Sequence, residues 1–266
     1  MGKCSPQSRT LSAIKDLMYN LDMIVHPQWE NRFAEKKMTV IAESLLDLAT
    51  HSNVRSEMPY LDQYVKDFMS ALEKGEPSSI EDALLTLYIR LHSTGFRYSQ
   101  SEKEILKKRN AYLCHPGGLS PLILAEKFIR PETTVADLGA GNGLQGLLLQ
   151  RICPHRKTIQ IELSAELIRI GKIFQEALGI SSDRIEWIHD DIVNVSIDAA
   201  DFIYLYRPAK PLERGKELYQ AIARKLSAGN KPLVIFSVAD CLGHYLDTRF
   251  SISYTDGHLT CFVRNC

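Results

Sequence analysis

The stretch VADLGAGNGL (residues 135–144) decides the fold. It passes from the apolar pattern of a strand through three glycines into the pattern of a helix. Glycine permits a sharp turn, positive φ angles and a close approach of a ligand to the main chain. Ligands bind beyond the strand ends of open parallel sheets. We therefore predict a strand, a tight turn and a helix, with a ligand beside the turn.

The sequence that follows alternates short β-branched runs with helical stretches, which predicts a parallel sheet with crossover helices. Two runs of alternating residues around Asp256-Gly257 predict a terminal antiparallel hairpin with a two-residue turn. We expect strands at 134–138, 158–161, 185–188, 201–205 and 233–238, helices at about 143–152, 165–178 and 212–228, and hairpin strands at 250–254 and 259–263.

The first 110 residues have a helical pattern and little strand character. Apolar residues recur every three or four positions, which predicts amphipathic helices; the stripes run over 11–24, 38–48, 61–72 and 80–91. Ser101 and Glu104 have the spacing of a capping box before a short basic helix. We therefore expect a helical N-terminal domain at 1–110 and an α/β domain at 111–266.

The overall composition excludes several classes of protein. Thirty-two basic and 32 acidic residues give a net charge of zero, so no global field attracts polyanions and there is no strong nucleic-acid signal. No apolar run is long enough to cross a bilayer. The six cysteines are scattered, without the spacing of metal ligands. We expect a cytoplasmic protein with reduced thiols, no metal and no membrane segment, and the oligomeric state stays open.

The spacing of the three glycines separates two kinds of ligand. In the dinucleotide-binding pattern G-x-G-x-x-G the third glycine would fall at Leu144, whereas the pattern present is G-x-G-x-G. This resembles motif I of the class I, seven-stranded S-adenosylmethionine-dependent methyltransferases, an acid-x-G-x-G-x-G signature that Asp137, Gly139, Gly141 and Gly143 match. The resemblance covers roughly the last 150 residues. It implies a mostly parallel Rossmann-like sheet with an antiparallel C-terminal strand, S-adenosylmethionine as cofactor, and methyl transfer.

Two acidic positions sharpen this resemblance. Glu162 ends the second predicted strand, where a carboxylate can accept hydrogen bonds from both ribose hydroxyls. The segment after the third strand resembles the adenine-contacting part of the family, and alignment by strand length favours Asp191 over Asp190. The expected cofactor-binding residues are Asp137, Gly139, Ala140, Gly141, Asn142, Gly143, Glu162, Leu163, Asp190, Asp191 and Ile192.

The end of the fourth strand is where the fold places the acceptor. Family members that methylate exocyclic or amide nitrogens carry Asn/Asp-Pro-Pro-Tyr there, but this chain has Tyr206-Arg207-Pro208. The departure leaves the acceptor atom open, with a small molecule or a protein favoured over nucleic acid. Tyr206 is expected to orient a nucleophile, and Arg207 to pair with a carboxylate of the substrate or cofactor. These two residues are the catalytic candidates.

Two alternatives to a methyltransferase stay open. One is a catalytically silent scaffold that keeps the cofactor pocket while its helices bind a partner. The other is a nicotinamide-dependent oxidoreductase, supported only by the glycine loop and by the acid Glu162 after the second strand. The basic run 103–109 is interpreted as a solvated helix face, and Tyr112 and His115 as solvated loop residues. The N-terminal helices fit a lid, a dimer face or a docking module equally well.

Overall fold

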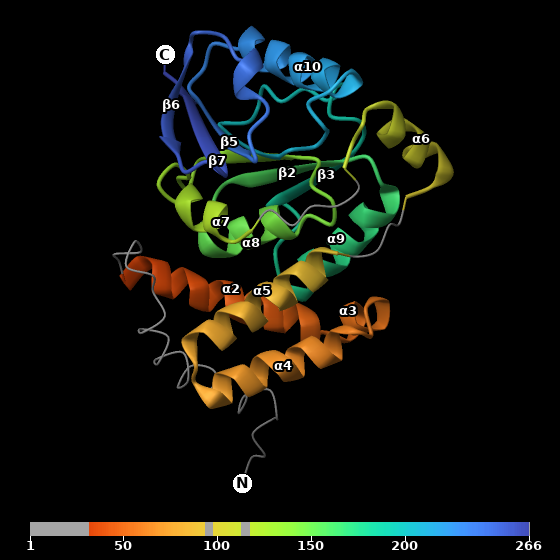
Figure 1. Cartoon of the computed structure of the whole chain (residues 1–266), viewed down its shortest axis with the longest axis vertical. Helices are drawn as coiled ribbons and strands as arrows, with labels where there is room; N and C mark the ends of the chain where they lie inside the picture. The colour runs from red at the N-terminus through yellow and green to blue at the C-terminus, as the bar shows by residue number, and fades with distance from the viewer. Residues whose placement is uncertain (1–31, 94–97, 113–117, 266) are drawn as a thin grey trace. The chain divides into compact units, whose positions relative to one another are not determined.

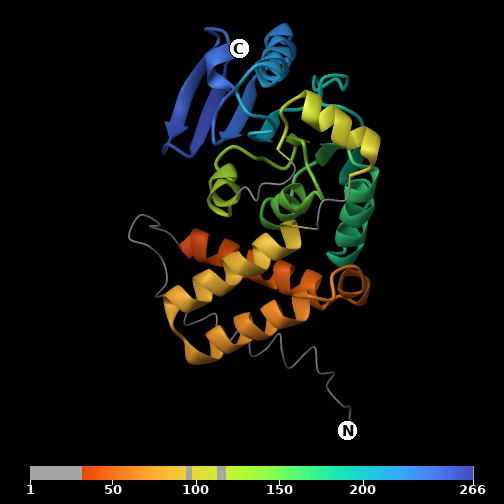
Figure 2. The same cartoon turned by 45° about the vertical axis from the view of Figure 1, so that its right-hand side comes forward.

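The computed structural model describes residues 32–93, 98–112 and 118–265. The helix predicted at 11–24 and the loop residue His115 lie outside these ranges. The chain divides into two compact units, Met1–Leu91 and His92–Cys266 (Figures 1 and 2). Among the described residues, no helix is both long and apolar enough to span a membrane.

The first unit is helical, as predicted. Its helix α4 (Leu61–Lys74) is followed by Gly75, whose φ of +70° suits the left-handed position that commonly follows a helix. The three predicted stripes within the described residues each lie on a helix and face the unit's core, with Leu45, Leu72 and Leu87 fully buried. The helices are α2 (Arg32–Thr50), α3 (Ser52–Glu57), α4 (Leu61–Lys74) and α5 (Pro77–His92).

The second unit contains a seven-stranded sheet of order β3-β2-β1-β4-β5-β7-β6. The first five strands run parallel, and β7 pairs antiparallel with both β5 and β6, so all the predicted strands and the hairpin are confirmed. The hairpin turn has three residues, 256–258, not two. The strands are β1 (Thr134–Leu138), β2 (Lys157–Glu162), β3 (Ile185–His189), β4 (Phe202–Tyr206), β5 (Leu233–Val238), β6 (Phe250–Thr255) and β7 (Leu259–Arg264).

Helices cover both faces of this sheet. In Figure 1, α10 lies on one face, and α7, α8 and α9 lie on the other. Every residue of β1 is buried, as expected for a parallel strand packed on both sides. The helices are α7 (Ser120–Ala125), α8 (Leu144–Ile152), α9 (Ala165–Ala177) and α10 (Arg214–Ala228), followed by the short 3₁₀ helix η2 (Gly243–Tyr245).

Helix α6 (Gln100–Lys108) belongs to the second unit, which corrects the domain boundary expected at 110. After α6, residues 110–112 run antiparallel to 208–210: Tyr112 N–H donates to the Pro208 carbonyl (3.1 Å), and Lys210 N–H donates to the Asn110 carbonyl (2.9 Å). These hydrogen bonds join α6 to the loop after β4. The boundary therefore follows Leu91.

The capping box of α6 is also displaced from its predicted position. Ser99 and Glu102 form it, two residues before the predicted pair. The Ser99 hydroxyl accepts from Glu102 N–H (3.3 Å), and the Glu102 carboxylate accepts from Ser99 N–H (2.6 Å). The predicted pair has the same spacing, so spacing alone does not choose between the two registers.

The third glycine of the loop is required by packing. A Cβ added at Gly143 would lie 2.2 Å from Trp187 Cη2, and one added at Gly171 would lie equally close to the same atom. Trp187 is held in place because its Nε1–H donates to Gln175 Oε1 (2.8 Å). The indole therefore packs where two helices present a bare backbone to β3.

We predict that Gly143→Ala destabilises the protein more than Gly179→Ala. Both positions have positive φ (+71° and +62°), which costs a residue with a Cβ about 1 kcal/mol. Only Gly143 adds a clash with Trp187, since nothing lies within 4 Å of the Gly179 position. Overpacking of this kind costs about 1–3 kcal/mol more. Urea unfolding measures both variants, and equal losses would contradict the packing role.

Candidate active site

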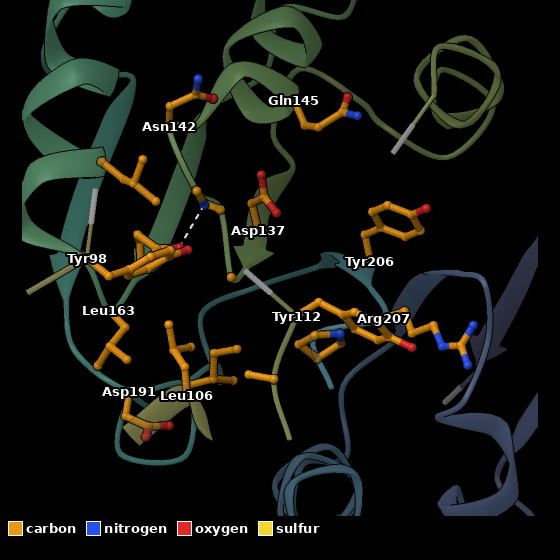
Figure 3. A pocket seen from close by; sticks show the side chains of 18 of the residues that line it. Tyr98, Leu106, Tyr112, Asp137, Asn142, Gln145, Leu163, Asp191, Tyr206 and Arg207 are labelled. Carbon is orange, nitrogen blue, oxygen red and sulfur yellow. Dashed lines mark hydrogen bonds between the residues drawn. The ribbon is translucent and has the colours of Figure 1, made fainter. Parts of the chain in front are cut away.

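A cavity of about 260 Å³ lies at the carboxyl edge of the sheet, within the second unit. Its walls come from the ends of β1, β2 and β4, from the loops that follow β1 and β3, and from residues 98–112, which include α6 and are called the α6 segment below (Figure 3). Ligands of open α/β sheets bind at this edge.

Most of the residues singled out from the sequence meet in this cavity. Gly143 is the exception, since it packs against Trp187 and does not line the cavity. The predicted residues that do line it are Asp137, Gly139, Ala140, Gly141, Asn142, Glu162, Leu163, Asp190, Asp191, Ile192, Tyr206 and Arg207.

The backbone amides of the glycine loop are used inside the protein. Gly139 N–H and Ala140 N–H both donate to the carbonyl of Ile161 at the end of β2 (3.0 Å each). Gly141 N–H donates to Glu162 Oε2 (2.8 Å), and Gly143 N–H donates to the Ala140 carbonyl (2.8 Å). The loop is therefore bonded to the end of the neighbouring strand.

The main chain of the loop is open to a ligand at Gly141. Its φ is +60°, and a Cβ added there would meet nothing within 4 Å. The equivalent atom at Gly139 would contact Ile192 Cδ1 at 3.6 Å. A ligand can therefore lie against the main chain at Gly141, where any side chain would fill the space.

Glu162 is buried beside this open backbone. Its Oε2 accepts from Gly141 N–H, and its Oε1 accepts from Ser164 N–H (2.8 Å). Burial raises the pKa of the carboxyl, and the backbone hydrogen bonds oppose that rise. A carboxylate has about four lone-pair sites, so each oxygen can accept a further hydrogen bond from a ligand hydroxyl.

Asp137 is a second buried acid in the same wall. Burial, and then the charge of Glu162, raise the pKa of Asp137 to about 7, against a hydrogen bond from the Gly146 backbone. Among the described residues, no group hydrogen-bonds to its Oδ2. Since Oδ2 of an ionised Asp137 lacks a partner among these residues, a cationic ligand would stabilise the charged form of Asp137.

Asp191 and Asp190 differ in their surroundings. Asp191 Oδ2 forms an ion pair with Arg109 of α6 (2.7 Å), and its Oδ1 accepts from Val193 N–H (3.1 Å). Asp190 is exposed, and its Oδ1 accepts from the Asn194 side chain (2.9 Å), which lowers the pKa of Asp190. The ion pair gives Asp191 the more fixed position.

The α6 segment is the part of the cavity wall that the sequence interpretation missed. Glu102 joins it to the start of α9, since its Oε1 accepts from Ala165 N–H (3.2 Å). Leu106 and Arg109, three residues apart on one helix face, both line the cavity, a spacing that was a usable signal within the basic run. Other lining residues that were missed include Tyr98, Ala111, Tyr112, Gln145, Tyr204, Pro208 and Leu218.

Tyr206 and Arg207 lie across the cavity from Leu163 and Asp191 (Figure 3). Burial raises the pKa of Tyr206 further above its ordinary alkaline value, so its hydroxyl is protonated at neutral pH. The Arg207 guanidinium carbon lies 5.5 Å from the centre of the Tyr112 ring. Tyr112, interpreted from the sequence as a solvated loop residue, is thus part of the wall. Within the described residues, no cluster of three His, Cys, Asp or Glu side chains could hold a metal ion.

Comparisons with known proteins find similarity in structure only. No family model and no curated protein matches the sequence. An RNA methyltransferase from Salinibacter ruber, solved in complex with S-adenosyl-L-homocysteine, is 17% identical, with 55% of this chain and 88% of that chain covered and a TM-score of 0.43. TrmN from Thermus thermophilus is 16% identical, with 55% and 48% covered and a TM-score of 0.45.

A further similar structure is a putative RNA methyltransferase from Pyrococcus horikoshii. It is 15% identical, with 56% of this chain and 84% of that chain covered and a TM-score of 0.42. The sheet described above is mostly parallel and has an antiparallel C-terminal strand, β7, as the sequence resemblance implied. The second unit has a Rossmann-like α/β fold, with the mixed seven-stranded sheet that the resemblance to the class I methyltransferases implied.

Proposed function

We propose that this protein is an S-adenosylmethionine-dependent methyltransferase. The observation that carries the proposal is the open main chain at Gly141 directly beside the buried Glu162 carboxylate, at the carboxyl edge of this sheet. A nucleoside needs both features, a surface to lie against and an acceptor for its ribose hydroxyls.

The cavity supplies groups for each part of such a cofactor. Glu162 accepts hydrogen bonds from the ribose, and Leu163 and Ile192 provide apolar contacts for the base. Asp191, held by Arg109, is the acid proposed to accept from the adenine amine. Asp137 faces the positive charge of the cofactor.

The hydrogen bonding of the loop argues against a dinucleotide. A pyrophosphate needs backbone N–H groups at the start of the helix after the first strand. Here the amides of Gly139, Ala140 and Gly141 donate to Ile161 and Glu162, and Leu144 N–H donates to Asn142 Oδ1 (3.3 Å). The loop therefore suits a ligand without phosphate, and no observation favours the oxidoreductase.

The protein's part in the reaction is to position two reactants. When bound, S-adenosylmethionine supplies a methyl group already activated by its sulfonium. Alignment and exclusion of water are therefore the main contributions of the cavity, and good alignment is worth about 7–11 kcal/mol. Tyr206, protonated at neutral pH, can orient the acceptor through its hydroxyl, and Arg207 can pair with an anionic group.

The acceptor is not identified. The sequence favoured a small molecule or a protein over nucleic acid, and that preference gains no support, because the similar structures reported above include RNA methyltransferases. No specific observation favours the silent scaffold.

The function is tested by calorimetric titration with S-adenosylmethionine and NAD, followed by incubation of the protein and donor labelled in the methyl group with cell extract. We expect binding of S-adenosylmethionine, no binding of NAD, and transfer of label to one molecular class. Absence of S-adenosylmethionine binding would overturn the proposal, and binding without any transfer would favour the scaffold.

We predict that Gly141→Ala loses at least tenfold in affinity for S-adenosylmethionine, because the new Cβ fills the open surface. Gly179→Ala is the matched control, since it has a similar φ (+62° against +60°) and similarly empty surroundings outside the cavity. The two variants should therefore lose similar stability, about 1 kcal/mol. Unchanged affinity in Gly141→Ala, measured by calorimetry, would remove the loop from the site.

We predict that affinity for S-adenosylmethionine rises between pH 6 and pH 8. Asp137, with a pKa of about 7, is mostly protonated at the lower pH and ionised at the higher. The cofactor carries a net positive charge, so the ionised carboxylate binds it better, and the effect approaches tenfold per pH unit below the pKa. S-adenosylhomocysteine, which lacks the sulfonium charge, and the Asp137→Asn variant should both show a weaker dependence. A dependence that is equally steep in all three titrations would contradict this role.

A further inference from the structure

The cavity is electrostatically divided. Its acidic lining residues, Asp137, Glu162, Asp190 and Asp191, come from the ends of β1 and β2 and from the loop after β3. Figure 3 shows Arg207 on the other side of the cavity from Asp191. Arg109, the other arginine in the lining, is paired with Asp191 (2.7 Å).

Arg207 has no acidic partner in the part of the chain that the structure describes. No carboxylate there lies within ion-pair distance of its guanidinium, and its Nε–H is buried without a hydrogen-bond acceptor. Buried donors in folded proteins are nearly always satisfied. The guanidinium of this cavity-lining arginine can therefore donate to an acceptor that a ligand brings.

The main chain holds Arg207 in an unfavourable conformation. Its backbone φ is +22°, a value that residues other than glycine rarely adopt. The hydrogen bond from Tyr112 N–H to the carbonyl of Pro208, and the bridge between Ala111 and Ala209, fix the residues directly after it. Strain of this kind persists where the surroundings enforce it, and it is concentrated at functional sites.

The Arg207 guanidinium lies over the Tyr112 ring. The Arg207 Cζ atom lies 5.5 Å from the centre of the Tyr112 ring, within the range of a cation–π contact. A cation–π contact leaves the N–H groups of a guanidinium to donate to other acceptors. Two parallel bonds from a guanidinium match a carboxylate or a phosphate.

Arg207 lies close to the place where the proposed methyl transfer would occur. Arg207 follows β4, whose Leu205 pairs with Leu138 of β1, so Arg207 lies at the same sheet edge as the glycine loop. A ligand anchored at Arg207 would extend toward Tyr206 and the cofactor side of the cavity. An anionic ligand is also attracted by the positive charge of bound S-adenosylmethionine.

We propose that Arg207 binds an oxyanion of the methyl acceptor, so that the substrate class is molecules carrying a carboxylate or a phosphate. This proposal rests on the proposed function only in naming the ligand as the acceptor. The presence of an oxyanion subsite at Arg207 is independent of methyl transfer and can be tested without it.

The first experiment compares melting temperatures of the wild-type protein, Arg207→Met and Arg169→Met, with saturating S-adenosylhomocysteine. Sodium phosphate, sodium acetate and sodium chloride are compared at equal ionic strength. Arg169 is the matched control, because it is exposed on α9 and pairs with Glu166 (2.8 Å) outside the cavity.

We expect phosphate or acetate to raise the melting temperature of the wild-type protein and of Arg169→Met by several degrees over chloride, and Arg207→Met to lose that increment. A larger increment from phosphate identifies a phosphate subsite, and a larger one from acetate a carboxylate subsite. Equal increments in wild-type protein and Arg207→Met, or none in either, would overturn the proposal.

The second experiment separates the acceptor from the cofactor. Calorimetry should give affinities for S-adenosylmethionine within about twofold in wild-type protein and Arg207→Met, whereas a tenfold loss would mean that Arg207 binds the cofactor's own carboxylate and would overturn the proposal. In the labelled-extract assay the methylated product should be retained on an anion exchanger. A labelled product that is not retained overturns the proposal, while failure of wild-type protein to bind S-adenosylmethionine overturns the proposed function alone.

Discussion

The Glu162 carboxylate, bonded to the amides of Gly141 and Ser164, is the constraint on which the site depends. It ties the loop after β1 to the end of β2, and the Ile161 carbonyl reinforces this tie by accepting from two further loop amides. Because these amides are used internally, the loop presents open main chain and an acid to a ligand in place of free N–H groups. The same interaction therefore shapes the surface and selects against phosphate.

Asp137 and Glu162 give one side of the cavity an acidic character, and Arg207 gives the opposite side a basic one. Burial and the charge of Glu162 raise the pKa of Asp137, and a cation bound in the cavity would offset the cost of ionising it. Arg207 has the opposite requirement, since its buried Nε–H lacks an acceptor. A cationic cofactor and an anionic acceptor would satisfy both ends at once, which accounts for the division in physical terms.

The α6 segment adds a wall that the sheet and its crossover helices do not supply. Glu102 joins it to α9, Arg109 joins it to the loop after β3, and residues 110–112 join it to the loop after β4. These three attachments, to one helix and two loops, hold Leu106 and Tyr112 in the cavity wall. Separately, the packing of Trp187 against Gly143 supports the glycine loop after β1.

The sequence by itself determined the strands, the main helices, the terminal hairpin and the acids at the strand ends, because each depends on a local periodicity or on a residue type at a turn. Only the tertiary structure decided that the third glycine, Gly143, packs against Trp187 and does not line the cavity. The tertiary structure likewise decided that α6 belongs to the second unit and that Arg109 pairs with Asp191. These depend on contacts between residues far apart in the chain, which local patterns do not encode.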